Sequence, residues 1–555
     1  MKKYRFIPAL ALCLLLCGCG APGQSAQSPS PGYPAAGDNA QASAGLTPPD
    51  VSGAFSKRDM KADYDAESAI NISLTRDSAV CADSSVSVEG SALTISGEGV
   101  YIISGSLQGC ITVDAPKTDK VQLVLSGVSV SSPDSAAIYV RQADKVFITL
   151  AEGTENSLSN TEGFDSAEDK IDAAVFSRDD LTVNGGGSLA ISSPYGHGIA
   201  AKDELTITGG SLSVTAAKHA LDVNDSIAVC GGSLELSAGK DALHAENEDD
   251  TSLGWIYITG GSFSINAGDD GAHASGAVLI DGGSIVINSS YEGIEGKTIT
   301  ISGGSMDITA KDDGLNAADG SAQSNFRGFG GFGGSADCNI SISGGSISIS
   351  ADGDGIDSNG SLNISGGDIR IAGANYGDSS IIDYESTASF TGGRLFGTGA
   401  STMAENFTGA ENGGAIMLNV GNQSTGTLIS LTDSVGNVLL SERAERDFSC
   451  LLIADGYIQA GESYFLSLDG AVTEISMENA IYGSGGGMPG MGGMHGGGKG
   501  GFGGRGGMPG TDQMPDMGEM PDMSELPDMD GMPGMDERPD NGQRPGGDFP
   551  SRPRN

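Results

Sequence analysis

The chain has 555 residues and a formal net charge of −43, because 72 acidic residues outnumber 29 lysines and arginines. Such a polyanion repels a phosphate backbone, so the composition argues against nucleic acid as a partner and fits cation binding or a simple solubility role. Aromatic residues make up only 5% of the chain, fewer than a stacked-ring cellulose platform would prefer. Beyond residue 19 the cysteines are odd in number and have no paired or zinc-type spacing.

The first segment is predicted to direct export. A basic start precedes an apolar run at 7–16, which is too short for a comfortable transmembrane helix. The following LCGC resembles a bacterial lipobox, which makes residues 1–19 a lipoprotein signal peptide and Cys19 the lipidated N-terminus. An ordinary secretory signal is the alternative. The lipid anchor predicts an extracellular protein held at the surface of the bacterial membrane.

Residues 20–66 are predicted to be a flexible tether. They are rich in Ser, Pro, Ala and Gly and contain almost no large apolar side chains. A segment of this composition cannot bury enough surface to offset the entropy of ordering it.

A repeat organises the chain that follows. A Gly-Gly pair followed by alternating apolar residues recurs, with its first glycine at positions 186, 209, 231, 260, 282, 303, 344, 366 and 392. The base period is near 22, and two longer gaps place inserted loops at about 246–252 and 319–337. A period of this length predicts a solenoid, in which each unit buries its apolar face only against its neighbours.

The pattern inside one unit identifies the kind of solenoid. In residues 209–231 the runs SLSV, ALDVN and SIAV each alternate apolar and other residues, and Gly, Asp and Asn lie between them. This period of two predicts three short strands per unit of about 22 residues, hence an all-β parallel β-helix over residues 67–414. A leucine-rich repeat has a similar length but needs a Leu/Asn frame that is missing. The paired glycines fit corners that need positive φ or close approach of the next turn.

The pattern changes after residue 414. Residues 415–482 contain longer alternating runs and the turn sequence DSVGN at 433–437. The open end of a solenoid must be covered to prevent edge pairing, so a small antiparallel β cap or an appended β domain is predicted. Residues 483–555 consist mainly of Gly, Met, Pro and Asp, which predicts a disordered tail.

Candidate metal ligands lie in one column of the repeat. The corner after each Gly-Gly strand carries His197, His219, Asp241, Asp270, Glu292, Asp313 or Asp354. An outward position three residues later carries Ala200, Asp222, His244, His273, Glu295, Asn316, Asp357 or, by continuation, Asp383. Neighbouring strands lie about 4.8 Å apart, so acids on successive turns repel one another and raise each other's pKa.

Calcium would relieve this repulsion, because it accepts about six to eight oxygen ligands from Asp, Glu, Asn and backbone carbonyls. The alternative is that each Asp-Gly pair serves only the geometry of a tight corner. The predicted calcium ligands, at several sites, are Asp241, Asp269, Asp270, Glu292, Glu295, Asp312, Asp313, Asn316, Asp352, Asp354, Asp357 and Asp383.

Several phrases resemble a known family. GVYIISG at 99–105, LVLSGV at 123–128 and EGTEN at 152–156 occur together with the GG-S and DG-(I/L) turns. They resemble the secreted carbohydrate-binding β-helix lipoproteins of clostridia and related bacteria, over about residues 69–480. The resemblance implies a right-handed parallel β-helix, similar in shape to pectate lyases, that binds calcium and plant cell-wall polysaccharide.

Three functions remain open at this stage. The first is non-catalytic, calcium-dependent binding of an acidic pectin-type glycan, or of cellulose, by a monomer at the cell surface. Calcium is needed there as a bridge between two polyanions. The second is a pectate lyase, which needs a Lys or Arg base beside the metal. The third is a structural or adhesive stalk. The predicted sugar-binding residues are Lys240, Lys297, Lys311, Tyr291 and Tyr376.

Overall fold

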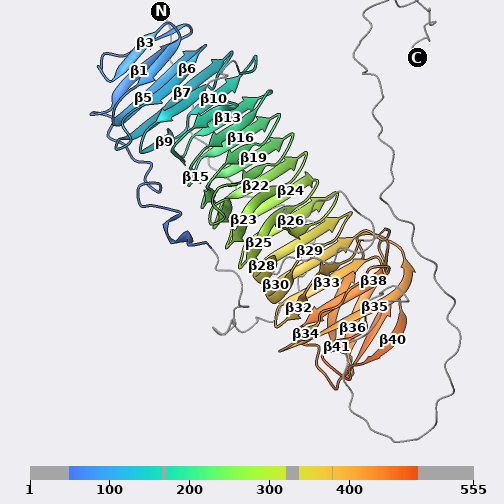
Figure 1. The fold of residues 1–555 in the computed structure, drawn as a ribbon. Coiled ribbons are helices and arrows are strands. Elements are labelled where there is room, and N and C mark those ends of the chain that lie inside the picture. The colour runs from blue at the N-terminus through green and yellow to red at the C-terminus, as the bar shows by residue number, and fades with distance from the viewer. Residues whose placement is uncertain (1–48, 165–169, 320–336, 378, 485–555) are drawn as a thin grey trace, which may run out of the picture. The chain divides into compact units, whose positions relative to one another are not determined.

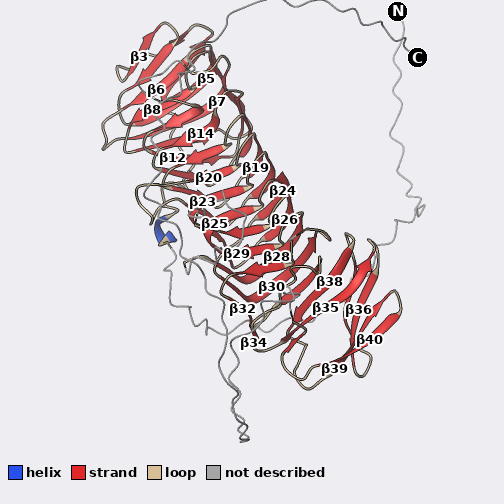
Figure 2. Cartoon of the chain, turned by 45° about the vertical axis from the view of Figure 1, so that its right-hand side comes forward, coloured by secondary structure: helices blue, strands red, loops and turns tan. Residues whose placement is uncertain are grey.

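The computed structural model describes residues 49–164, 170–319, 337–377 and 379–484 (Figure 1). The predicted signal peptide with Cys19, most of the tether, residues 320–336 of the second inserted loop and nearly all of the tail lie outside these residues. The described residues form strands and no α-helix, and one short 3-10 turn, η1, spans Val51–Gly53 (Figure 2). In the same ranges, no helical segment is long and apolar enough to cross a bilayer.

Seven strands begin the sheet and lead into the repeat. Antiparallel pairs join β1 to β2 and β3 to β4, whereas β1 pairs in parallel with β5, β4 with β6, and β5 with β7. These strands are β1 (Ile70–Thr75), β2 (Ser78–Val80), β3 (Val86–Glu89), β4 (Ala92–Ile95), β5 (Gly99–Leu107), β6 (Cys110–Asp114) and β7 (Lys120–Ser132).

From β7 to β30, each strand pairs in parallel with a strand one repeat later. Ser188 is in register with Ser211, and Ser211 with Ser233, so the chain returns to the same position after about 22 residues. This pairing forms three columns of strands, named here the glycine column, the acid column and the third column. The predicted all-β class with parallel strands is therefore confirmed. Figure 1 shows the strands following one another through the repeat.

The glycine column follows the Gly-Gly pairs. It contains β10 (Glu155–Asn160), β13 (Ser188–Ser193), β16 (Ser211–Ala216), β19 (Ser233–Ala238), β22 (Ser262–Ala267), β24 (Ser284–Ser290), β26 (Ser305–Ala310) and β33 (Arg394–Gly399). The acid column contains β8 (Ile138–Gln142), β11 (Ala173–Ser177), β14 (His197–Ala201), β17 (Leu221–Val223), β20 (Leu243–Ala245), β27 (Leu315–Ala317), β29 (Ile356–Ser358) and β31 (Ile382–Tyr384).

The third column contains β9 (Lys145–Leu150), β12 (Asp180–Gly185), β15 (Glu204–Ile207), β18 (Ser226–Val229), β21 (Trp255–Ile258), β32 (Thr387–Phe390) and β34 (Gly409–Ala410). β7 pairs with both the third and the glycine columns, and four longer strands after it also take part in two columns. β23 (Ala272–Ile280) and β25 (Ile294–Ile301) join the acid and third columns, and β28 (Asn339–Ala351) and β30 (Ser361–Gly373) join the third and glycine columns.

Apolar ladders fill the space between the columns. In the acid column, each turn contributes one buried residue that stacks on the equivalent residue of the next turn. Because the strands are parallel and in register, these residues form a continuous core. This ladder consists of Ile199, Leu221, Leu243, Ala272, Ile294, Leu315, Ile356 and Ile382. Since side chains alternate along a strand, the residue after each ladder member points outward.

The Gly-Gly corners bring successive turns into close contact. A Cβ on Gly344 would lie 2.1 Å from the backbone oxygen of Ser302 in the preceding turn. The next residue, Gly345, has φ +88°, a conformation that costs other L-residues energy. Both reasons predicted from the sequence, positive φ and close approach, therefore apply to the same pair.

Strand pairing becomes antiparallel after the repeat. The last strand of the glycine column, β33, pairs antiparallel with β38 (Phe448–Asp455), which also pairs antiparallel with β35 (Gly414–Gln423). The short strand β41 (Ile481–Tyr482) is an exception, because it pairs in parallel with β35. A separate four-stranded antiparallel sheet contains β36 (Leu428–Asp433), β37 (Val438–Arg443), β39 (Ser463–Leu468) and β40 (Ala471–Ser476). The edge of β33 is thereby covered by β38, as expected at the end of a solenoid whose open edge would otherwise pair with other chains.

Residues 50–62 differ from the tether that the composition predicts, because they pack against the repeat. Phe55 contacts apolar side chains of β18 and β21. The Asp59 side chain is buried, accepts a hydrogen bond from the Thr182 hydroxyl at 2.7 Å and lies 3.0 Å from Nζ of Lys145. The paired carboxylate of Asp59 therefore helps to hold residues 50–62 on the repeat, although their composition resembles that of a flexible tether.

Candidate functional site

The outward residues of the acid column lie in register on successive strands. Asp222 faces His244, His244 faces His273, and His273 faces Glu295. Glu295 then faces Asn316, followed by Asp357 and Asp383. This is the alignment that the repeat predicts, and it places titratable side chains one strand spacing apart, about 4.8 Å.

The corner residues form a second ladder beside this one. The backbone N–H of Asp241 donates to Nδ1 of His219 at 3.2 Å, and that of Asp270 donates to Asp241 Oδ1 at 3.0 Å. Glu292 N–H donates in turn to Asp270 Oδ1 at 3.2 Å. Corner side chains therefore do tie adjacent turns together, as the corner-geometry alternative requires. Asp241 and Asp270 each use one oxygen for this bond and keep the other for a histidine.

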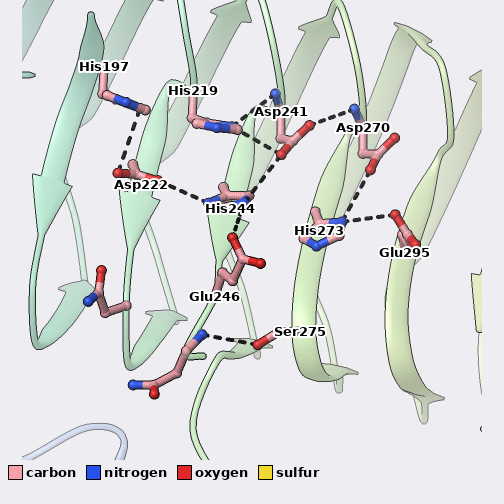
Figure 3. Close-up of polar contacts among 12 residues, drawn as sticks. His197, His219, Asp222, Asp241, His244, Glu246, Asp270, His273, Ser275 and Glu295 are labelled. Carbon is pink, nitrogen blue, oxygen red and sulfur yellow. Dashed lines mark hydrogen bonds and ion pairs between the residues drawn. The ribbon is translucent and has the colours of Figure 1, made fainter. Parts of the chain in front are cut away.

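The first part of the column balances its acids with histidines. His244 Nδ1 lies 2.9 Å from Asp222 Oδ1, and His197 Nδ1 lies 3.7 Å from Asp222 Oδ2. Burial by itself would raise the pKa of Asp222, but the hydrogen bond to His244 and the charge of His197 bring it down to about 2. We name the corner and outward residues from His197 to Glu295 the histidine segment. Figure 3 shows its residues on successive strands.

The imidazole rings of this segment are stacked. His219 and His244 have centroids 4.0 Å apart with their planes 20° from parallel. His197 lies 5.0 Å from His219, and His273 lies 5.3 Å from His244. The four histidines thus follow the strand spacing of the column rather than converging on one point.

The last histidine is shared by two acids. His273 Nδ1 lies 3.3 Å from Asp270 Oδ2 and 2.9 Å from Glu295 Oε2. Burial opposes a charged imidazole, but the hydrogen bonds to both carboxylates raise the pKa of His273 to about 11. Burial and the charge of Glu295 raise the pKa of the adjacent Glu292 to about 9.

The second part of the column gathers acids without histidine. Carboxylate oxygens of Asp313, Asp354 and Asp357 all lie within 4.8 Å of one another, and Asp383 is in register with Asp357. Burial and the charges of Asp313, Asp383 and Asp354 raise the pKa of Asp357 to about 8. Burial, followed by mutual repulsion, raises the pKa of Asp313 to about 7, and burial and the charge of Asp383 raise that of Asp354 to about 6.

One member of this group was not predicted from the sequence. Glu405 lies between β33 and β34, outside the repeat, and burial together with the charges of Asp383 and Asp354 raises its pKa to about 7. Its Oε2 is buried and has no hydrogen-bond partner. We name Asp313, Asp354, Asp357, Asp383 and Glu405 the carboxylate cluster. Since Glu405 belongs to no repeat, no periodic signal marks it.

Other predicted calcium ligands lie apart from the cluster or are engaged elsewhere. Asp352 is exposed and forms an ion pair with Arg446. Asp312 is half-buried, and its charge contributes to the raised pKa values of two cluster members. Asn316 is buried, donates from Nδ2 to Glu292 Oε2 at 2.7 Å and leaves its Oδ1 without a hydrogen-bond partner. Asp269 is exposed and lies beside Asp241 and Asp270.

An open pocket of about 400 Å³ lies over the histidine segment. Its lining includes Lys240 and Tyr291, two of the predicted sugar-binding residues, together with Glu292 and His273. The other predicted residues lie outside this lining. Lys311 and Tyr376 are exposed, and Lys297 lies 3.6 Å from Asp337 in an ion pair.

Comparisons with known proteins point to carbohydrate. A family described as "Carbohydrate-binding domain-containing protein" matches residues 89–328. A protein of Acetivibrio thermocellus with the same description is 38% identical over 135 residues, which are 24% of this chain and 47% of that protein. The chain thus spans about half the length of this curated relative. A solved structure described as the polysaccharide lyase-like protein from C. thermocellum, gadolinium derivative, has 31% identity and a TM-score of 0.37, covering 45% of this chain and 97% of its own.

Proposed function

We propose that this protein is a non-catalytic, calcium-dependent binder of acidic polysaccharide. The observation that carries the proposal is the carboxylate cluster, in which half-buried acids lie close together and raise one another's pKa. The match to a carbohydrate-binding family supports the polysaccharide part of the proposal.

Calcium fits the cluster for two reasons. Oxygen atoms bound to one calcium ion at about 2.3–2.6 Å can lie no more than about 5 Å apart, and the three aspartates meet this limit. The buried Oε2 of Glu405 has no hydrogen-bond partner, and a bound cation would satisfy it. Asp313, Asp354 and Asp357 would hold the ion, with Asp383 and Glu405 beside them.

Calcium would also explain how two polyanions associate. A chain with net charge −43 repels a polyuronate unless a cation bridges them. A calcium ion held by the cluster would keep coordination positions open for uronate carboxylates. A pectin-type plant glycan carries one such carboxylate on each uronate sugar. The exposed ring of Tyr291 provides an apolar face for a sugar on the same column.

The proposal also includes a parallel β-helix architecture and a lipid anchor. The three columns, with parallel register from turn to turn, support a right-handed parallel β-helix with the acid column as one face. Lipidation at Cys19 would hold a monomer at the bacterial surface, where plant polysaccharide is accessible.

Calorimetry with polygalacturonate tests the proposal. The full chain is titrated with calcium present and again with excess chelator, alongside Asp357→Asn. Asp307→Asn is the matched control, because Asp307 is exposed on β26 in the glycine column. Binding should occur only with calcium, disappear in Asp357→Asn and persist in Asp307→Asn. Equal binding in chelator would disprove calcium dependence, and an absence of binding in every condition would favour a structural stalk.

A calcium-dependent lyase is the second candidate, because Lys240 and Tyr291 share a pocket with the acids of the histidine segment. A lyase needs a base at this place to abstract a proton next to the uronate carboxylate. Ultraviolet absorbance from unsaturated sugar ends, followed in the same samples, distinguishes the two functions. Rising absorbance that is lost in Lys240→Ala would establish the lyase, and constant absorbance with calcium-dependent binding supports the binder.

A further inference from the structure

We propose that Asp270, His273 and Glu295 form a binding site for a divalent transition-metal ion, with Zn²⁺ as the probe. The site is distinct from the carboxylate cluster and does not depend on calcium binding there. Calcium prefers oxygen ligands, whereas imidazole nitrogen is a ligand of zinc, nickel, copper and iron. The part of the column that contains histidine is therefore suited to a transition metal, and the part that contains only carboxylates is suited to calcium.

The two distances from His273 to the carboxylates match the shape of such a site, and all three ligand atoms lie within 4.8 Å of one another. His273 Nδ1 lies 2.9 Å from Glu295 Oε2 and 3.3 Å from Asp270 Oδ2 (Figure 3). Zinc binds nitrogen and oxygen at about 2.0–2.2 Å, so two ligands at 90–109° around it are roughly 2.9–3.5 Å apart. Zinc would replace the proton shared by these atoms, because an imidazole nitrogen binds a metal only when it is deprotonated.

The other histidine triads fit less well. His219, Asp241 and His244 also lie within 4.8 Å of one another. However, the two rings are stacked 4.0 Å apart and only 20° from parallel. A nitrogen lone pair lies in the plane of its ring, so two parallel rings cannot point at the same ion unless one turns. The Asp270 triad uses a single ring and has no such conflict.

The neighbouring corners hold the Asp270 carboxylate in place. Its Oδ1 accepts the backbone N–H of Glu292 at 3.2 Å, and its own N–H donates to Asp241 Oδ1 at 3.0 Å. The residue is only 6% exposed. Partners of this kind orient a metal ligand and restrict its rotation, as outer-shell hydrogen bonds do at zinc sites. Oδ2 is left facing His273.

The site opens on one side to solvent and to a ligand. All three residues line the pocket of about 400 Å³, together with Lys240 and Tyr291. Three protein ligands with an accessible fourth position are typical of zinc sites that bind an exchangeable group. A carboxylate-bearing sugar in the pocket has the chemistry to occupy that position.

Zinc binding to the full chain tests the proposal. Metal-free protein is loaded with Zn²⁺ in a large excess of Ca²⁺, and bound zinc is counted by elemental analysis and its affinity measured by calorimetry. The variants are His273→Ala and Glu295→Gln, and circular dichroism checks their fold. Glu235→Gln is the matched control, because Glu235 is exposed on β19 in the glycine column. Zinc bound elsewhere on the chain is common to all variants, so it cancels when their zinc contents are compared.

We expect wild type and Glu235→Gln to hold one more zinc per chain than either site variant. Loss of a ligand should weaken binding at this site by at least roughly 100-fold, since loss of an outer-shell partner alone costs 10–100-fold. Equal zinc content in wild type and a folded site variant would overturn the proposal, as would displacement of the zinc by calcium. Asp357→Asn should retain this zinc while losing calcium, which keeps the two metal proposals separable.

Discussion

Calcium binding to the carboxylate cluster should release protons at pH 7. With pKa values of about 8, 7 and 6, Asp357 is mostly protonated at this pH, Asp313 is about half protonated and Asp354 is mostly ionised. Calcium binds only the ionised carboxylates and must displace these protons. Summed over the three groups, roughly one to two protons should leave for each ion bound.

The measurement is calorimetry of calcium binding to the metal-free protein in buffers of different ionisation enthalpy. The slope of the observed enthalpy against the buffer enthalpy gives the number of protons released. Asp357→Asn should reduce that number by about one and weaken binding, because it removes the group with the highest pKa of these three. Asp307→Asn should change neither quantity.

The sign of the pH dependence follows from the same pKa values. Protons compete with calcium, so affinity should rise with pH between about 6 and 8, by up to about tenfold per unit for each proton displaced. Above this range the slope should fall toward zero. Tight calcium binding whose enthalpy is identical in every buffer would refute the argument that these acids are held close together and protonated.

Three further predictions concern stability. Gly344→Ala forces a methyl group to within 2.1 Å of the Ser302 oxygen and should cost roughly 1–3 kcal/mol in urea unfolding, whereas Gly53→Ala, which meets no atom within 4 Å, should cost much less. Burial and the charges of three aspartates raise the pKa of Asp203 to about 6, so stability should fall as pH rises from about 4 to 6. Asp203→Asn should therefore raise Tm at pH 7 but not at pH 4. Asp59→Ala removes the carboxylate that lies 3.0 Å from Lys145, whose side chain is 12% exposed, and trypsin should therefore cleave residues 50–62 faster than in wild type. Unchanged cleavage would contradict this role.

The periodic part of the structure could be predicted from the sequence. A repeat near 22 residues with three alternating runs fixes which residues face one another, so the register of His273, Glu295, Asn316 and Asp357 follows from counting. Parallel pairing between identical positions leaves little freedom, because a slip of one residue would expose the apolar ladder. Burial of the ladder and positive φ at the glycines follow for the same reason.

The residues that the sequence could not supply are those whose partners come from outside the repeat. Glu405 reaches the carboxylate cluster from the segment after β33, and Arg446 pairs with Asp352 from the segment before β38. Asp59 packs against the third column from the far N-terminal side. Each contact joins positions far apart in the chain with no spacing rule between them, so only the folded structure brings them together.

The two parts of the acid column differ in what neutralises them, and this difference decides where calcium is required. In the histidine segment, each outward acid has an imidazole nitrogen within 3.0 Å, and a protonated ring or a transition metal can balance the charge. In the carboxylate cluster the neighbours that perturb Asp357 most are other acids, so the protein must bind either protons or a cation there. At pH 7 protons alone satisfy the cluster only partly. Calcium, and with it the bridge to an acidic glycan, should therefore bind at β29 and β31. The histidine segment does not depend on that calcium.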